Sequence, residues 1–256
     1  MSSKTAKIRF YSAWFCPYAQ RAWMVLNNLA ITYNLIESLE IDNATQGYKK
    51  NRRLLEINQK GLVPTLEVFE TDPSDGNHNV DINQKPPRVV MESIDVMKFL
   101  YEYVGKLVGD AELRDANIVN KTVCSPYYRC LMKQVKEEQV KGWNDILYGL
   151  ESFAEYIVDG KFYKSDTVNI VDFTLYPWAC RLYILEEFRG FKLDQNLPWV
   201  KKFLDWKQRM ESEVIGVKET LPDRDQLLKS YERYSDATAK SLVGNAVNAG
   251  KEAHDI

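Results

Sequence analysis

The stretch Trp14-Phe15-Cys16-Pro17-Tyr18-Ala19-Gln20-Arg21 separates a strand-like segment at residues 8–12 from a helix-like segment at residues 17–29. Pro17 suits the first position of a helix, because its missing N–H would have no partner there. Cys16 then becomes the N-cap, where free backbone N–H groups and the helix dipole favour an anion. A thiol in such a place can have its pKa lowered from about 8.5 to roughly 3.5–7.5. The stretch therefore predicts a reactive thiolate at a strand-to-helix junction, with a buried structural cysteine as the alternative.

Cys16 lacks the second cysteine that a dithiol oxidoreductase carries three residues further along, where this chain has Ala19. A lone nucleophile can form a mixed disulfide with a substrate, but a thiol from solution must then release it. The other cysteines, Cys124, Cys130 and Cys180, fall on expected helices. We expect them to pack in the core rather than to take part in chemistry.

Residues 1–106 alternate between extended and helical patterns. Strand-like segments lie at residues 8–12, 33–36, 65–69 and 88–91, and helix-like segments lie at 17–29, 48–57 and 94–104. This order predicts a first domain with a small α/β sheet that carries helices on its faces. The polar stretch Glu70–Pro87 is far longer than a tight turn, so we expect a mobile surface loop there.

Residues 107–235 have helical periodicity throughout and predict a second, all-helical domain. Asn169 and Asp172 fit a capping box, in which each side chain accepts a hydrogen bond from the other residue's backbone N–H. The helix that follows is nearly all apolar through Leu185 and is predicted to run through the middle of this domain. Residues 236–256 contain few large apolar side chains, so we expect a flexible tail.

The composition excludes several classes of protein. Of the 256 residues, 45% are hydrophobic and 27% are charged, with a net charge of −2, which provides no overall field for nucleic acid or an anionic membrane. No apolar run is long enough to span a bilayer and no secretory signal is evident, so we expect a cytoplasmic protein. His78 and His254 are poorly placed for a metal site or a buried base, and we expect no metal. Glycine motifs for dinucleotides and for the P-loop are absent.

Two further clusters accompany Cys16. In Gly61-Leu62-Val63-Pro64, a proline begins a strand, and a cis bond there would expose the backbone of Val63 to a ligand, although a trans bond is the more common state. In Met91-Glu92-Ser93, a strand ends and a helix begins. The Ser93 hydroxyl and the free N–H groups at the helix start can bind a carboxylate, and the Glu92 side chain can bind an ammonium group. A plain helix cap is the alternative.

Together, these clusters resemble the cysteine-type glutathione transferases of the omega and lambda classes over residues 8–215. Cys16–Arg21 is similar to the family's Cys-Pro-Phe-Ala-Gln-Arg, with Tyr18 in place of Phe, and Tyr176–Leu182 is similar to the omega segment Trp-Pro-Trp-x-x-Arg-Leu. The resemblance implies a thioredoxin-like N-terminal domain followed by an all-α domain. Ala22-Trp23 is closer to the lambda class and the Pro-Trp segment is closer to the omega class, so the class stays open.

The resemblance also implies the roles of individual residues. Cys16 is the catalytic nucleophile, Val63 and Pro64 form the segment that pairs with the cysteinyl part of glutathione, and Glu92 and Ser93 hold its γ-glutamyl end. The remaining positions implied are Tyr18 for the tripeptide, Lys50 for its glycine carboxylate, and Trp178 and Arg181 for the pocket of the second substrate. Lys50 has a solvated surface lysine as its alternative, and Arg21 is expected to make structural salt bridges.

The expected activity is glutathione-dependent thiol transfer or reduction through a mixed disulfide on Cys16, such as deglutathionylation of small adducts or dehydroascorbate reduction. The partners are glutathione as co-substrate and a small electrophilic or glutathionylated substrate, with a homodimer as one expected assembly. The alternatives are a non-catalytic relative similar to chloride intracellular channels and a ligandin-type binder of hydrophobic molecules.

Overall fold

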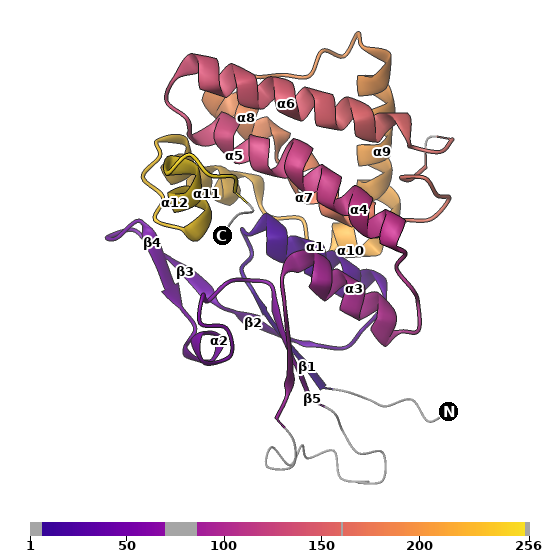
Figure 1. Ribbon diagram of the computed structural model, residues 1–256, viewed down its shortest axis with the longest axis vertical. Coiled ribbons are helices and arrows are strands. Elements are labelled where there is room, and N and C mark those ends of the chain that lie inside the picture. Colours follow the sequence, from indigo (N-terminus) through magenta and orange to yellow (C-terminus); the bar gives the residue numbers. More distant parts are fainter. Residues whose placement is uncertain (1–6, 70–85, 160, 254–256) are drawn as a thin grey trace.

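The computed structural model describes residues 7–69, 86–159 and 161–253. Its N-terminal part contains a four-stranded mixed sheet in the order β2-β1-β5-β6 (Figure 1). The strands are β1 (Lys7–Ser12), β2 (Asn34–Glu37), β5 (Thr65–Phe69) and β6 (Arg88–Met91). β1 pairs with β2 in parallel and with β5 antiparallel, and β6 is antiparallel to β5. Every residue of β5 is buried, because this strand lies inside the sheet and is covered on both faces.

Three helices belong to this sheet domain: α1 (Pro17–Asn28), α2 (Arg52–Ile57) and α3 (Ser93–Tyr103). α1 and α3 pack against each other, and α1 also contacts helices α7 and α10 of the C-terminal part. Both faces of α1 are therefore covered, as its run of buried residues from Ala19 to Leu26 shows, with Trp23 half-buried. The helix that begins at Cys16 is held by both parts of the protein.

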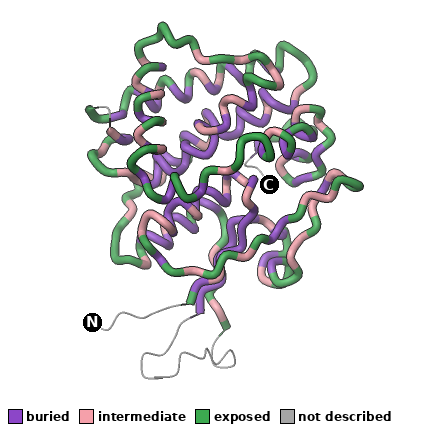
Figure 2. Tube along the Cα trace, turned by 180° about the vertical axis from the view of Figure 1, so that it is seen from behind, coloured by how far each residue is buried: buried purple, intermediate pink, exposed green. Residues whose placement is uncertain are grey.

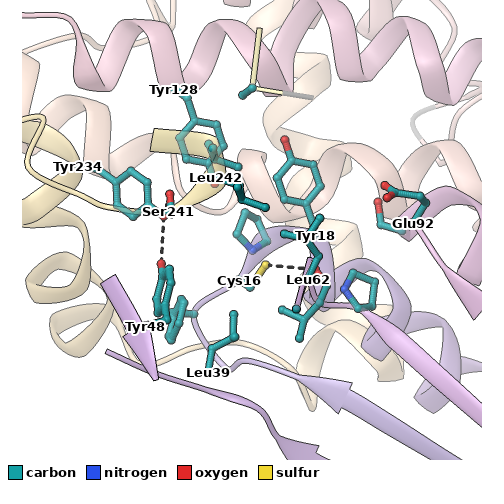
Figure 3. Close-up of a pocket in the computed structure, with 18 of the residues that line it drawn as sticks. Cys16, Tyr18, Leu39, Tyr48, Leu62, Glu92, Tyr128, Tyr234, Ser241 and Leu242 are labelled. Atoms are coloured by element: carbon teal, nitrogen blue, oxygen red, sulfur yellow. Dashed lines mark hydrogen bonds between the residues drawn. The ribbon is translucent and has the colours of Figure 1, made fainter. Parts of the chain in front are cut away.

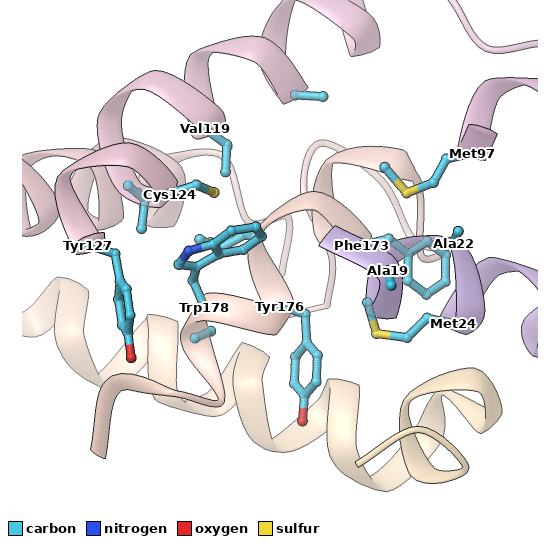
Figure 4. Packing of buried hydrophobic residues seen from close by; sticks show 14 of the residues in the cluster. Ala19, Ala22, Met24, Met97, Val119, Cys124, Tyr127, Phe173, Tyr176 and Trp178 are labelled. Carbon is cyan, nitrogen blue, oxygen red and sulfur yellow. The ribbon is translucent and has the colours of Figure 1, made fainter. Parts of the chain in front are cut away.

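The rest of the described chain is helical. Its elements are α4 (Asp110–Val119), a π-helical turn η1 (Asn120–Cys124), α5 (Ser125–Met132), α6 (Lys136–Glu155), α7 (Ile170–Ala179), α8 (Leu182–Arg189), α9 (Pro198–Glu213), α10 (Ile215–Lys218), α11 (Arg224–Ser235) and α12 (Leu242–Asn248). Every residue of α7 is buried, so this helix lies in the middle of the domain as predicted (Figures 2 and 4). A mixed sheet followed by a helical region is the expected architecture.

The capping box of α7 is present. The backbone N–H of Val171 donates to the Asn169 side chain at 2.9 Å, and the N–H of Asn169 donates to Asp172 Oδ2 at 3.0 Å. Asp172 Oδ1 also accepts from the Trp206 indole at 2.8 Å and from the backbone N–H of Tyr163 at 3.0 Å. Burial nevertheless raises the pKa of Asp172 to about 6, since these neutral donors only partly replace water.

Several sequence-based expectations need correction. The expected helix at 48–57 begins only at Arg52, because residues 39–50 form a hairpin of β3 (Leu39–Asp42) and β4 (Gly47–Lys50). The apolar helix that was expected to reach Leu185 ends at Ala179 and resumes as α8. The expected flexible tail contains the helix α12, whose small residues let it pack against α5. Most of the Glu70–Pro87 loop, as well as His78 and His254, lies outside the described residues.

Candidate active site

A cavity of about 480 Å³ lies between the sheet domain and the helices α5, α11 and α12 (Figure 3). This volume falls within the range of small-molecule sites, about 300–1,000 Å³. The residues predicted from the sequence for the nucleophile and the tripeptide all line it: Cys16, Tyr18, Lys50, Val63, Pro64, Glu92 and Ser93. These residues come from four separate parts of the chain, so the fold brings together what the motifs only suggested.

Cys16 is the N-cap of α1, with Pro17 at the first helical position, as the sequence predicts. The carbonyl of Cys16 accepts the first helical hydrogen bond, from the N–H of Gln20 at 3.0 Å. Its thiol is half-buried, and Sγ lies 3.9 Å from the carbonyl oxygen of Val63 (Figure 3). The sulfur therefore faces the Val63–Pro64 segment across the cavity.

The pKa of the Cys16 thiol is raised, contrary to the sequence-based expectation of a lowered one. Burial is the largest cause, because the cavity walls replace the water that would solvate a thiolate. The backbone N–H groups of Ala19 and Tyr18 and the guanidinium groups of Arg181 and Arg21 act in the opposite direction. The helix N-terminus thus favours the anion as expected, but desolvation outweighs it.

The peptide bond between Val63 and Pro64 is cis. Asn58 fixes the approach to this bond, because its side-chain amide donates to the carbonyl of Leu62 at 3.2 Å and to the hydroxyl of Thr65 at 3.1 Å. Leu62, Val63 and Pro64 all line the cavity beside Cys16. The backbone of Val63 is therefore available to an extended peptide-like ligand.

Glu92 and Ser93 connect β6 to α3 at the other end of the cavity. Glu92 has φ +67°, a left-handed conformation that costs a non-glycine residue about 1–3 kcal/mol and is often found at ligand sites. Its carboxylate is exposed, and Asp95 lies close by in the sequence and also lines the cavity. This end of the cavity is therefore acidic at its rim.

The Ser93 hydroxyl accepts a hydrogen bond from Arg21 Nη1 at 3.0 Å. Arg21 is fully buried and also donates to the carbonyl of Thr174, to Asn120 Oδ1 and to Cys124 Sγ. These partners are neutral, so the expected structural salt bridges of Arg21 are not found among the described residues. Because the Ser93 oxygen already accepts from a cation, its own proton is left to donate to an acceptor in the cavity.

Lys50 brings a positive charge to the cavity. It is half-buried, it lines the cavity, and its ammonium group donates to the backbone carbonyl of Lys60 at 2.5 Å. Burial lowers its pKa. Gly61 leaves room for this side chain, since an added Cβ would come within 2.6 Å of Lys50 Cδ. The lining of the cavity therefore contains a cation, Lys50, as well as the acids Glu92 and Asp95.

Trp178 and Arg181 do not line the cavity, which corrects their expected place in the second-substrate pocket. Both side chains are fully buried, and Figure 4 shows Trp178 among the packed core residues. Arg181 donates to Gln20 Oε1 at 2.5 Å and to the carbonyl of Pro177 at 2.6 Å, and the Trp178 ring packs under the edge of Tyr18. Trp178 lies on α7, where every residue is buried, and Arg181 is the N-cap of α8, so both side chains face the core rather than a ligand.

The sequence analysis missed the second wall of the cavity. This wall consists of tyrosines and C-terminal residues: Tyr48, Tyr128, Tyr231, Tyr234, Lys240, Ser241, Leu242, Val243, Asn245 and Ala253 (Figure 3). Tyr128 and Tyr231 lie at helical spacing, which is typical of core residues and gives no signal of a cavity. Tyr234 also lies on a helix, α11, while Tyr48 falls on the hairpin that was not predicted and the remaining residues fall in the expected tail.

Comparisons with known proteins show similarity to glutathione S-transferases. The family model for the N-terminal domain of glutathione S-transferases matches residues 15–102. The chain is 25% identical over 208 residues to pyrimidodiazepine synthase of Drosophila melanogaster, which covers 80% of this chain and 76% of that protein. It is 25% identical over 218 residues to glutathione S-transferase omega-1 of Mus musculus, with 82% and 79% covered.

Solved structures have the same fold. Glutathione transferase Omega 3C of Trametes versicolor aligns with a TM-score of 0.69 and 24% identity, covering 91% of this chain and 92% of that one. A rice glutathione transferase solved in complex with glutathione aligns with a TM-score of 0.69 and 16% identity, covering 89% and 96%. By its N-terminal domain, its fold and its curated relatives, the chain is similar to glutathione transferases, including those of the omega class.

Proposed function

We propose that this protein is a glutathione-dependent thiol transferase that uses Cys16 as its single nucleophile. Glutathione lies along the cavity with its cysteinyl part against Val63 and its sulfur beside Cys16. Its γ-glutamyl ammonium group faces Glu92, its γ-glutamyl carboxylate accepts from Ser93, and its glycine carboxylate faces Lys50. The charged and polar lining residues support this orientation, because an acid suits the ammonium group, a hydroxyl suits one carboxylate and a lysine suits the other.

Thiol transfer then proceeds in two exchanges. The Cys16 thiolate attacks the glutathionyl sulfur of a mixed disulfide, the old S–S bond breaks, and the substrate leaves as a thiolate that takes up a proton. The thiolate of a second glutathione attacks the glutathionyl sulfur on Cys16, which releases oxidised glutathione and restores the Cys16 thiolate. Arg21 and Arg181 favour this thiolate by their charge, although burial keeps the free enzyme mostly in the thiol form at neutral pH.

The observation that carries the proposal is the sulfur of Cys16 in a cavity lined by every residue predicted for glutathione. The test is the intact mass after incubation with oxidised glutathione. We expect one glutathione adduct on the wild type and on Cys180→Ala, which removes the other half-buried thiol, and none on Cys16→Ala. Cys16→Ala should lose thiol transfer by orders of magnitude and still bind glutathione. Full reductase activity in Cys16→Ala would refute the mechanism.

A non-catalytic binder of the ligandin type is the second candidate, and the raised pKa of Cys16 favours it. Such a protein would bind glutathione without forming the adduct on Cys16. A channel-like role draws no support from the helices, since none of those in the described residues is long and apolar enough to cross a membrane. The same mass measurement separates the enzyme from the binder.

A further inference from the structure

The C-terminal segment, residues 240–253, forms one wall of the cavity that contains Cys16. It contributes six of the lining residues: Lys240, Ser241, Leu242, Val243, Asn245 and Ala253. In the close-up, Leu242 lies above the Cys16 sulfur, on the side of the cavity opposite the sheet domain (Figure 3). Access to the sulfur therefore depends on where this segment lies.

One end of the segment is attached to the sheet domain. The backbone N–H of Lys240 donates to the carbonyl of Gln46 at 2.8 Å, in the turn of the β3–β4 hairpin. Tyr48 of the hairpin shares a hydrogen bond of 3.0 Å with the hydroxyl of Tyr234, which donates to Ser241 Oγ at 3.0 Å. The hairpin and the segment are thus joined on the side of the cavity where Tyr48 lies.

The other end is attached to the helical domain. Glu252 accepts from Arg129 of α5 at 2.9 Å, and α12 packs against α5. A tight turn sets the position of α12, because a Cβ on Gly244 would lie 2.5 Å from the carbonyl oxygen of Ala239. The segment therefore spans both domains and is attached at both of its ends.

We infer that this segment restricts the second substrate to small molecules, such as mixed disulfides of glutathione with small thiols, and excludes glutathionylated proteins. The inference rests on the proposed function and names its substrate class. In disulfide exchange the leaving sulfur must come into line with Cys16 Sγ, so the leaving group enters between the sheet domain and the wall that residues 240–253 form. A small thiol fits there beside glutathione, whereas the folded surface around a protein cysteine meets this wall.

The first experiment needs no turnover. Cys16 is labelled with N-ethylmaleimide and with a maleimide on a polyethylene glycol chain, and the labelled peptide is identified by mass spectrometry. Each rate is divided by the rate at which free glutathione reacts with the same reagent. On this scale, Cys16 of the wild type should react roughly tenfold or more slowly with the large reagent than with the small one, because the hydrogen bonds that hold the C-terminal segment must open first. Gly244→Ala and a chain ending at Ala239 should largely lose this difference. Gly250→Asn is the matched control, because nothing lies within 4 Å of its Cβ and Asn tolerates the positive φ there.

The second experiment compares kcat/KM for a glutathione–cysteine mixed disulfide and for a glutathionylated protein. In the wild type, kcat/KM should be at least tenfold higher for the small substrate. In Gly244→Ala and in the chain ending at Ala239, the ratio of the two kcat/KM values should be closer to one. Equal rates on the two substrates in the wild type, or equal labelling by the two maleimides, would overturn the inference. If Cys16 turns over neither substrate in any variant, the proposed function fails, while the labelling result still decides whether the segment restricts access.

Discussion

Replacing Ser93 by Ala tests how the cavity would recognise the γ-glutamyl carboxylate. The Ser93 oxygen accepts from the buried Arg21, so its own proton is left to donate to the carboxylate of a ligand. A hydrogen bond to a charged group contributes about 1.5–3 kcal/mol. Its loss corresponds to roughly a 10- to 150-fold rise in the Kd for glutathione.

The assay is isothermal titration calorimetry in the Cys16→Ala background, where no disulfide can form. Glutathione is compared with an analogue that has hydrogen in place of the γ-glutamyl carboxylate. Ser93→Ala should weaken the binding of glutathione strongly and leave the binding of the analogue nearly unchanged. Ser93→Ala also leaves one N–H of Arg21 without its partner, which lowers stability, but such an effect would weaken both ligands alike.

Cys124→Ala serves as the control, since it removes another partner of Arg21 and does not line the cavity. It should change the affinity for both ligands equally or not at all. If Ser93→Ala lowered the affinity for both ligands equally, the assigned role of the Ser93 hydroxyl would be refuted.

Three further predictions concern thiol ionisation and packing. Because burial raises the pKa of Cys16, its alkylation rate should keep rising with pH between 7 and 9, and a plateau below pH 7.5 would contradict this. The pKa of Asp172 is raised to about 6 from 3.8, so the folded state holds its proton more tightly than the unfolded state. Relative to Asp172→Asn, the wild type should therefore lose up to about 3 kcal/mol of unfolding free energy as the pH rises from 4 to 7. If the unfolding free energies of the two proteins changed equally with pH over this range, the prediction would be wrong. Gly216→Ala places a Cβ 2.0 Å from the carbonyl oxygen of Met24 and should lower the free energy of unfolding by about 1–3 kcal/mol, whereas Ile215→Ala at the adjacent exposed site should change it little.

The parts of the site that local chemistry determines were predictable from the sequence. Proline after Cys16 indicates an N-cap, and the observed helix begins there. The turn at Glu92-Ser93 likewise follows from a strand that meets a helix. These signals lie within a few residues of each other, so they do not depend on how distant segments pack.

The parts that depend on packing were not predictable. Trp178 and Arg181 lie in a mostly apolar stretch of the sequence, and such a pattern cannot distinguish a cavity wall from a core. The small residues after position 240 suggested disorder, yet Gly244 and Ala246 are small because α12 packs closely. The pKa of Cys16 depends on how much water the surrounding walls exclude, which no local motif records.

The helix that begins at Cys16 is covered by α7 and α10 as well as by α3. Its Arg21 donates to Thr174 on α7, and Gln20 donates to the carbonyl of Thr220 just beyond α10. Expressed alone, residues 1–106 would expose a buried guanidinium and the apolar face around Ala22. The two halves are therefore not interchangeable modules, and a chimera that exchanges the helical half would have to rebuild the support beneath the nucleophile.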